Sequence, residues 1–231
     1  RKAPIYDRDI NIGKVDPTKP MIAFSFDDGP AYDYNGSNST KRILDVLEKY
    51  NARATFFMVG ERVNDETKHL LDKEIQLGCE LGNHTYSHNH YGSQVTASDI
   101  SKASKQIEKI SSKAPTMFRC PGGSITPAIR KECKKEGMPL AYWSVDTEDW
   151  RSKDAGKVYK NITKYAYDGS IVLMHDIYPS TADAVEKVVP ELIAKGYQIV
   201  TVSELIAAKT GDNPKPGNQY VDYKTINNNT H

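Results

Sequence analysis

The sequence is poor in cysteine, in net charge and in long apolar runs, and each shortage argues against a class of protein. Its three cysteines, Cys79, Cys120 and Cys133, are too few for a disulfide framework, and they lack the CxxC spacing of a structural zinc site. The formal net charge of +1 provides no strong field for nucleic acid or an anionic membrane, so we expect neither as a partner. No apolar run is long enough for a transmembrane helix, so we expect no membrane segment in this chain.

What the chain does contain is typical of a globular protein with a sizeable core, because 38% of its residues are apolar and 26% are charged. Its length of 231 residues suits one domain or a tight pair of domains. The chain opens on Arg1 without a recognisable signal peptide, so we expect a trimmed form that has lost an upstream signal or anchor.

Apolar runs of strand length alternate with helical patterns about seven times between residues 21 and 210. Such alternation predicts a parallel sheet with crossover helices, and this number of units favours a closed or nearly closed (β/α)7-8 barrel. An open doubly wound sheet is the alternative. Residues 1–20 predict an extended lead-in, and residues 211–231, rich in Gly, Asn, Pro, Lys and Thr, predict a polar C-terminal tail. In both kinds of sheet ligands bind at the carboxyl ends of the strands, so the residues that follow each strand are the candidates for a site.

The first expected strand ends in two adjacent carboxylates. Residues 21–24 form an apolar run, Asp27 and Asp28 follow, and a Gly-Pro pair then breaks the chain. Because alternate side chains of a strand face opposite ways, Asp27 faces away from Phe24 and Phe26. Asp28, at the turn, can point into the same space as Asp27. Taken alone, the pair is equally consistent with a polar turn, because Asp-Gly is ordinary turn chemistry.

Two histidines follow the third expected strand at a spacing that suits a metal ion. His84 and His88, four residues apart, can meet on one face of a helical turn and bind one ion. The alternative is a pair of surface histidines in a polar loop. A carboxylate is needed as a third ligand, and Asp27 or Asp28 supplies a candidate. Zn²⁺, Co²⁺, Ni²⁺ or Fe²⁺ would each fit such a set.

The next two strand ends add a cation, a glycine turn and an indole. Arg119 can hold an aspartate ionised, although an isolated arginine more often belongs to a solvated or structural ion pair. The turn at residues 121–123 exposes backbone N–H groups that could serve an oxyanion. Trp150 suits either the core or the wall of a pocket.

A further histidine, His175, follows the sixth apolar run and is a candidate acid–base group, with Asp149 or Asp176 as its partner. Imidazole is suited to that task because its charge changes near neutral pH. Titratable residues therefore gather at one end of the predicted sheet, where barrel enzymes hold their sites.

Five segments at these strand ends resemble, in order along the chain, the five motifs of the polysaccharide deacetylases, also called NodB-homology or carbohydrate esterase family 4 proteins. The segments are residues 25–30 (SFDDGP), 84–88 (HTYSH), 119–123 (RCPGG), 146–150 (DTEDW) and 173–175 (LMH). Each segment alone is a weak signal, but five in the same order are highly specific. The resemblance extends from about residue 21 to residue 208. It implies a distorted (β/α)7-8 barrel, an open groove and the removal of acetyl groups from polymeric sugars.

The resemblance also implies roles for residues on the metal side of the site. Carried over by position, Asp28, His84 and His88 bind one divalent metal, zinc in the first place, with cobalt or nickel as alternatives. Asp27 is the general base, and Arg119 holds it in place.

On the other side of the site, the resemblance implies that His175 is the general acid and that Asp149 tunes it. The backbone N–H of Gly122 helps to hold the oxyanion. Pro121, Trp150 and Leu173 shape the pocket for the acetyl group.

Two positions depart from what is common in this family. Ser25 stands where threonine is commoner, which should matter little. Gly122 stands where many members carry tyrosine, so the backbone donor survives but an aromatic wall of the groove is expected to be lost. That loss bears on substrate preference more than on activity.

These observations favour a metal-dependent hydrolase that removes acetyl groups from N-acetylglucosamine-containing polysaccharide, either peptidoglycan or a chitin-like chain. The alternatives are an acetylxylan esterase, which is an O-deacetylase on the same scaffold, and a carbohydrate-binding relative without catalysis. A metal-dependent phosphoesterase would favour more cations, and Arg119 is the only one counted at these strand ends apart from the histidines. We expect a monomer that works outside the cell or in association with the cell envelope.

Overall fold

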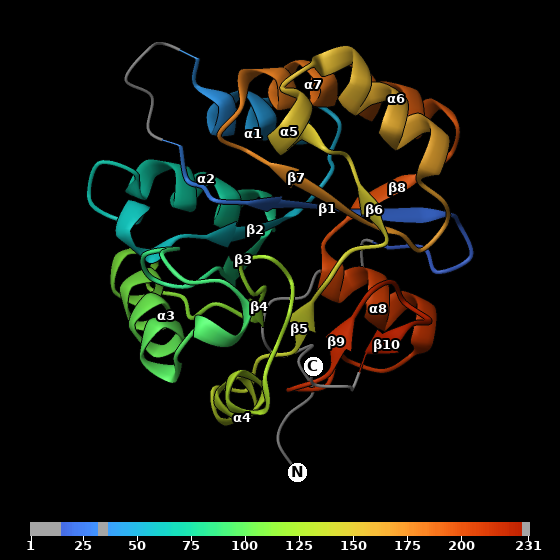
Figure 1. Cartoon of the computed structure of the whole chain (residues 1–231). Helices are drawn as coiled ribbons and strands as arrows, with labels where there is room; N and C mark the ends of the chain where they lie inside the picture. The colour runs from blue at the N-terminus through green and yellow to red at the C-terminus, as the bar shows by residue number, and fades with distance from the viewer. Residues whose placement is uncertain (1–14, 32–36, 228–231) are drawn as a thin grey trace.

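The strands of the described chain form one curled sheet, and most of the helices pack around its outside (Figure 1). The last helix, residues 202–210, instead packs against the core cluster inside the curl. The structure is a computed structural model, and it describes residues 15–31 and 37–227. The strands are β1 (Met21–Asp27), β2 (Thr55–Met58), β3 (Glu80–Asn83), β4 (Met117–Phe118), β5 (Leu140–Ala141), β6 (Val145–Asp146), β7 (Ile171–His175), β8 (Gln198–Val200), β9 (Gln219–Tyr220) and β10 (Ile226–Asn227). The helices are α1 (Ser39–Lys49), α2 (Lys68–Leu77), α3 (Ala97–Ser111), α4 (Pro127–Lys135), α5 (Asp149–Ser152), α6 (Ala155–Tyr165), α7 (Pro179–Ala194) and α8 (Val202–Thr210), with the short 3-10 helices η3 (Gly60–Arg62) and η4 (Gly92–Gln94).

Strand β1 lies at the centre of the sheet and has three parallel neighbours. From β2 the sheet continues through β3, β4 and β5, and from β7 it continues to β6, with parallel pairing throughout. Only residues 142–144 separate β5 from β6 along the chain, so the two arms of the sheet approach each other and the sheet curls into a half-barrel. The expected distorted barrel is therefore confirmed, in place of an open doubly wound sheet.

Alternation along β1 explains which of its side chains reach the site. Phe24 and Phe26 belong to the core cluster between the sheet and the outer helices, whereas Ala23 belongs to a second cluster inside the curl. Successive side chains of a strand point to opposite faces. Ser25 and Asp27 therefore share the inner face with Ala23, as the sequence predicts.

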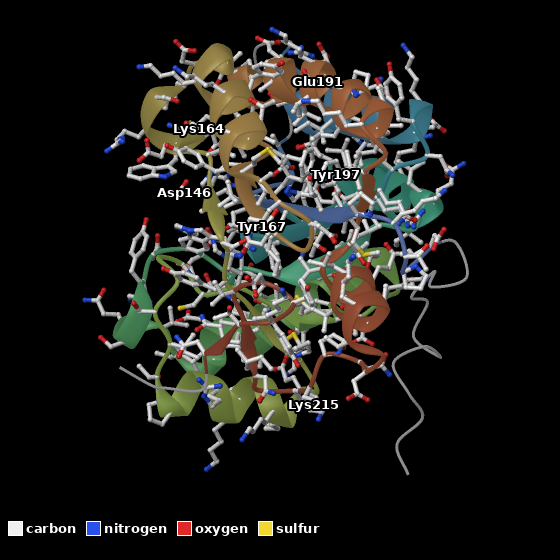
Figure 2. All side chains as sticks on the ribbon, turned by 90° about the vertical axis from the view of Figure 1, so that its right-hand side faces the viewer. Asp146, Lys164, Tyr167, Glu191, Tyr197 and Lys215 are labelled. Atoms are coloured by element: carbon white, nitrogen blue, oxygen red, sulfur yellow. The ribbon has the colours of Figure 1, made fainter. Side chains whose placement is uncertain are left out.

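Local sequence accounts for the crossover helices. In α1 the apolar residues Ile43, Leu44 and Leu47 recur at helical spacing and are all buried. Helix α3 begins with a capping box, in which Thr96 and Asp99 each accept the other's backbone N–H. Charged groups such as that of Lys164 on α6 lie at the outside of the molecule (Figure 2). None of the helices in the described part of the chain has both the length and the apolar character needed to cross a bilayer.

The stretch expected to be a polar tail joins the sheet. Strand β9 pairs in parallel with β5, and β10 pairs antiparallel with β9. The ring of Tyr220 is buried in the inner core cluster, and the side-chain amide of Gln219 donates a hydrogen bond to the carbonyl of Gly123. The expected tail at residues 211–231 is therefore wrong as far as residue 227, because two-residue strands leave no periodic pattern to detect. Residues 228–231 lie outside the described part.

Part of the expected lead-in is also anchored to the sheet. The backbone N–H of Asp16 donates to the side chain of Gln198 in β8, and the side chain of Gln198 donates back to the carbonyl of Asp16, both at 2.8 Å. Val15 is buried in the inner cluster. Residues 1–14, the rest of this lead-in, lie outside the described part.

Replacing Tyr220 by alanine tests whether the C-terminal strands support the fold. We expect the free energy of unfolding to fall by about 3 kcal/mol, because truncating a buried ring leaves a cavity in the core. Urea denaturation followed by circular dichroism measures the change. Tyr165→Ala, which removes a ring that is 52% exposed, is the matched control and should change the free energy by less than about 0.5 kcal/mol. Equal effects in the two variants would contradict the structural role.

Candidate active site

The polar residues predicted at the strand ends meet at one edge of the sheet. Asp27 ends β1 and Asp28 follows it, His84 follows β3, Arg119 follows β4 and His175 ends β7. Parallel strands bring their carboxyl ends to the same edge, so segments that lie far apart in the sequence contribute to one site.

Three of the predicted residues form a cluster suited to a metal ion. One ligand atom each from Asp28, His84 and His88 lie within 4.8 Å of one another. The Nε2 atoms of His84 and His88 lie 3.5 and 3.3 Å from Oδ1 of Asp28. That oxygen is buried and has no hydrogen-bond partner, although buried polar atoms are nearly always satisfied. A cation between these three atoms would satisfy it.

The hydrogen bonding and surroundings of the two imidazoles also suit the binding of a metal ion. The Nδ1–H of His84 donates to the backbone carbonyl of Arg119 at 2.7 Å, which leaves the lone pair of a neutral ring on Nε2, facing Asp28. Burial lowers the pKa of His88, against the opposing effect of the Asp28 carboxylate. Two imidazoles and one carboxylate are a ligand set that leaves coordination positions open.

The two histidines do not meet on a helical turn, which corrects the sequence prediction. Residues 84–90 are not helical, and Thr85 and His88 have φ angles of +70° and +56°. Asp28 likewise has a φ of +74°. Residues other than glycine rarely adopt these left-handed backbone angles, which cost about 1–3 kcal/mol per residue. Such residues are often found at functional sites. A bent loop therefore replaces the helix in bringing the ligands together.

Asp27 is held ionised by Arg119. The guanidinium of Arg119 donates to Oδ1 of Asp27 at 2.8 Å, to Oγ of Ser25 at 2.9 Å and to the carbonyl of Tyr142 at 2.8 Å. Burial alone would raise the pKa of Asp27, but the charge of Arg119, the nearby imidazoles and the hydrogen bond from Arg119 together outweigh burial and hold the pKa below its usual range. Oδ2 of Asp27 faces the cluster, 3.5 Å from Nε2 of His84.

His175 is paired with Asp149, which settles the choice of partner that the sequence leaves open. The Nδ1–H of His175 donates to Oδ1 of Asp149 at 2.8 Å, and its backbone N–H donates to Oδ2 at 2.7 Å. Burial lowers the pKa of His175, but the hydrogen bond to Asp149 and the nearby negative charges outweigh burial and raise it to about 9. Asp176 instead accepts a hydrogen bond from Thr40 at 2.6 Å, away from the imidazole.

The glycine turn lies under an aromatic ring from another loop. Gly122 is exposed and has a φ of +73°, and no described residue accepts its backbone N–H. A Cβ atom at Gly122 would lie 3.3 Å from Cδ1 of Tyr91. The expectation of a lost aromatic wall is therefore wrong, because Tyr91, which follows the second histidine motif, places its ring there. No spacing rule links the two positions in the sequence.

The residues expected around an acetyl group differ in their exposure. Trp150 is 47% exposed, and its indole N–H lies 3.5 Å from Oδ2 of Asp146. Asp146, the last residue of β6, is labelled in Figure 2. Leu173 in β7 and Pro121 in the glycine turn are both buried.

The sequence reasoning missed a second arginine at the site. Arg62, in the η3 turn after β2, donates from its guanidinium to the backbone carbonyl of Asp28 at 2.5 Å. Arg119 is therefore not the only cation at these strand ends. Counting the residues that follow the second expected strand, at Gly60, would have found it.

Comparison with known proteins agrees with this geometry. A sequence model of the polysaccharide deacetylase family matches residues 14–141, which is more than half of the chain. The chain belongs to the polysaccharide deacetylase family. It is 39% identical over 202 residues to the peptidoglycan-N-acetylmuramic acid deacetylase PdaC of Bacillus subtilis, an alignment that covers 84% of the chain and 40% of PdaC. It is 37% identical over 204 residues to a peptidoglycan-N-acetylglucosamine deacetylase of Bacillus cereus, which covers 85% of the chain and 92% of that protein.

Solved structures of family members share the fold of the chain. The structure of PdaC superposes with a TM-score of 0.78 at 37% identity, covering 85% of this chain and 95% of that one. An acetyl xylan esterase from Clostridium thermocellum, solved in complex with a cobalt ion, gives a TM-score of 0.77 at 30% identity and covers 89% and 100% of the two chains. The chain spans about two fifths of the length of full PdaC.

Exchanging each aspartate of the pair for asparagine separates their tasks. We expect Asp28→Asn to weaken zinc binding by at least ~10-fold, because even partners outside the direct ligands contribute that much to metal affinity. Asp27→Asn, the matched control next to it, should bind zinc with nearly the affinity of the unsubstituted protein. Isothermal titration calorimetry measures both. The opposite ranking would show that Asp27, and not Asp28, is the ligand.

Proposed function

We propose that the chain is a metal-dependent hydrolase that removes acetyl groups from N-acetylglucosamine-containing polysaccharide, with peptidoglycan as the leading substrate. The observation that carries the proposal is the order of groups across the site. The Asp28, His84 and His88 cluster has the ionised Asp27 at its edge, and the His175 pair belongs to the same strand ends. The names of the Bacillus relatives, both peptidoglycan deacetylases, support the substrate and a place at the cell envelope.

In this proposal Asp28, His84 and His88 hold one divalent cation, with zinc as the first choice and cobalt or nickel as alternatives. The cobalt ion in the Clostridium relative supports a metal of this group. A cation bound there supplies a Lewis acid, which favours ionisation of water and stabilises negative charge on oxygen.

Asp27 is the proposed general base. Its lowered pKa keeps it ionised at neutral pH, so it can accept the proton of the water that attacks the acetyl carbonyl. Arg119 fixes one of its oxygens, and the other faces the cluster. The base is therefore oriented before the substrate arrives.

The backbone N–H of Gly122 is the proposed donor to the carbonyl oxygen as negative charge develops on it. The exposed position of Gly122 and the absence of a described acceptor leave this N–H available. In comparable sites one such donor contributes about 3–4 kcal/mol to the stability of the transition state. Pro121, Trp150 and Leu173 are the proposed surroundings of the acetyl methyl group.

His175 is the proposed general acid. Asp149 engages Nδ1, so Nε2 is the atom that gives its proton to the leaving nitrogen. The raised pKa keeps the imidazole charged at neutral pH, which an amine leaving group requires. Bond cleavage then yields acetate and a free amino sugar.

A second candidate is an O-deacetylase such as an acetylxylan esterase. The similarity to the Clostridium acetyl xylan esterase favours it, and an alcohol leaving group depends less on protonation by His175. A binding protein without catalysis is less consistent with this chain, because Asp27, Arg119, Asp149 and His175 all stand in hydrogen-bonded pairs.

Acetate release from three polymers tests the proposal. We expect the zinc-loaded protein to release acetate from chitooligosaccharide or peptidoglycan faster than from acetylated xylan, and to stop when a chelator removes the metal. Asp27→Asn, which should still bind zinc, is the matched control and should lose at least about 100-fold in kcat. Faster release from xylan would establish the O-deacetylase, and no release from any polymer would contradict both candidates.

The pH profile tests the role of His175. The imidazole carries its proton below a pKa of about 9, so kcat/KM should fall as the pH rises through that value. A bound cation would offset the charge of Asp28, which places this alkaline limb at or below pH 9. In Asp149→Asn the limb should move to lower pH, because the hydrogen bond and the charge that raise the pKa are gone.

Asp146→Asn is the matched control for this profile, since Asp146 lies at the same strand end without contacting His175. Its limb should stay where it is in the unsubstituted protein. An unmoved limb in Asp149→Asn would show that a group other than His175 is the acid.

A further inference from the structure

Tyr91 is an exposed aromatic residue at the site that none of the proposed steps uses. Its side chain is 55% exposed, the largest value among the exposed large apolar residues of the described chain. Its ring stands edge-on to the imidazole of His88, with the ring centres 5.1 Å apart. A single exposed ring on a protein surface needs no explanation, but this one lies directly against a proposed metal ligand.

The loop that carries Tyr91 is anchored to the glycine turn at residues 121–123. The backbone N–H of Gly92 donates to the carbonyl of Pro121 at 3.2 Å. The η4 turn closes with a hydrogen bond from the N–H of Val95 to the carbonyl of Gly92, and Val95 is buried. Backbone hydrogen bonds therefore hold the loop after Tyr91 against the glycine turn, and the exposed ring of Tyr91 projects into solvent.

Glycine at position 122 makes room for the ring. A Cβ atom there would lie 3.3 Å from Cδ1 of Tyr91 and 3.8 Å from its Cβ, and the first distance is tighter than ordinary van der Waals contact. The ring and the exposed backbone of Gly122 thus border the same space. A substrate whose carbonyl reaches Gly122 also reaches Tyr91.

A flat aromatic face in this position suits a sugar ring. A pyranose presents C–H groups on one face, and these are attracted to the negative face of an aromatic ring. No described residue makes a hydrogen bond with the phenol of Tyr91, which leaves the hydroxyl for a sugar. On the His175 side Trp150 is the other exposed ring, tied by its backbone N–H to Asp149.

We propose that Tyr91 and Gly122 form a sugar-binding site in which one pyranose ring of the polymer lies against the face of Tyr91. The proposal rests on the function proposed above and adds the position of a sugar ring beside the metal cluster. Tyr91 contacts the substrate and takes no part in the proton transfers.

Binding of chitopentaose to zinc-loaded protein tests this site without turnover. The Asp27→Asn variant serves as the background, and isothermal titration calorimetry compares it with the same variant carrying Tyr91→Ala, Tyr91→Phe or Tyr165→Ala. We expect Tyr91→Ala to raise the Kd at least about tenfold, and Tyr91→Phe to keep it within about threefold because the ring face is retained. Tyr165→Ala removes an equally exposed ring on α6 and should leave the Kd unchanged.

Three results would overturn the proposal. An unchanged Kd in Tyr91→Ala would show that the ring does not contact sugar. A loss in Tyr91→Phe as large as in Tyr91→Ala would assign the effect to the hydroxyl instead of the ring face. Loss of zinc from Tyr91→Ala would show that the ring only supports His88.

Kinetics on two substrates separate this proposal from the proposed function. With Asp27 restored, Tyr91→Ala should lose at least about tenfold more kcat/KM on chitopentaose than on a small acetate ester without a sugar, mainly through KM. Equal losses on both substrates would contradict the sugar site. If the unsubstituted protein released no acetate from either substrate, the function would fail while the calorimetry still decided the sugar site.

Discussion

The buried guanidinium of Arg119 is the interaction on which the rest of the site depends. It is completely buried, and a buried cation is tolerated only when it is paired and hydrogen-bonded. Asp27 supplies the countercharge, Ser25 and a carbonyl accept two further N–H groups, and the ring of Phe57 lies 4.3 Å from the guanidinium carbon. The backbone carbonyl of the same residue fixes the tautomer of His84. One residue thus controls both the charge of the proposed base and the orientation of a proposed metal ligand, and it links the end of β4 to the end of β1.

Much of this arrangement could be predicted from the sequence because it follows from strand ends. Alternating apolar runs predict a parallel sheet, and a parallel sheet brings Asp27, Asp28, His84, Arg119 and His175 to one edge whatever the details of the helices. The order of the short motifs along the chain then pointed to the family that the comparison shows. The inward direction of the first aspartate also followed, because the pleat of a strand has a fixed period of two.

The parts that could not be predicted depend on contacts between segments without periodic patterns. The C-terminal stretch at residues 211–227 pairs through strands of two residues, whose partner is chosen by tertiary packing. The loop at His88 uses left-handed backbone angles, which residue types alone do not specify. Tyr91 covers Gly122 only because two loops from different strands are joined by a backbone hydrogen bond. Arg62 was overlooked for a simpler reason, since the end of β2 was not counted.

The hydrogen bonds of the Asp149 carboxylate restrict how His175 can transfer protons. Both of its oxygens are fully occupied, Oδ1 by the ring N–H of His175 and the backbone of Trp150, and Oδ2 by the backbone of His175 and the hydroxyl of Thr181. The imidazole of His175 is therefore held with Nδ1 towards Asp149, and only Nε2 is available for proton transfer. In the proposed reaction Nε2 must therefore both donate the proton to the leaving group and accept the next proton. Successive catalytic cycles are thus linked through a single atom, which must regain its proton before the next acetyl group is removed.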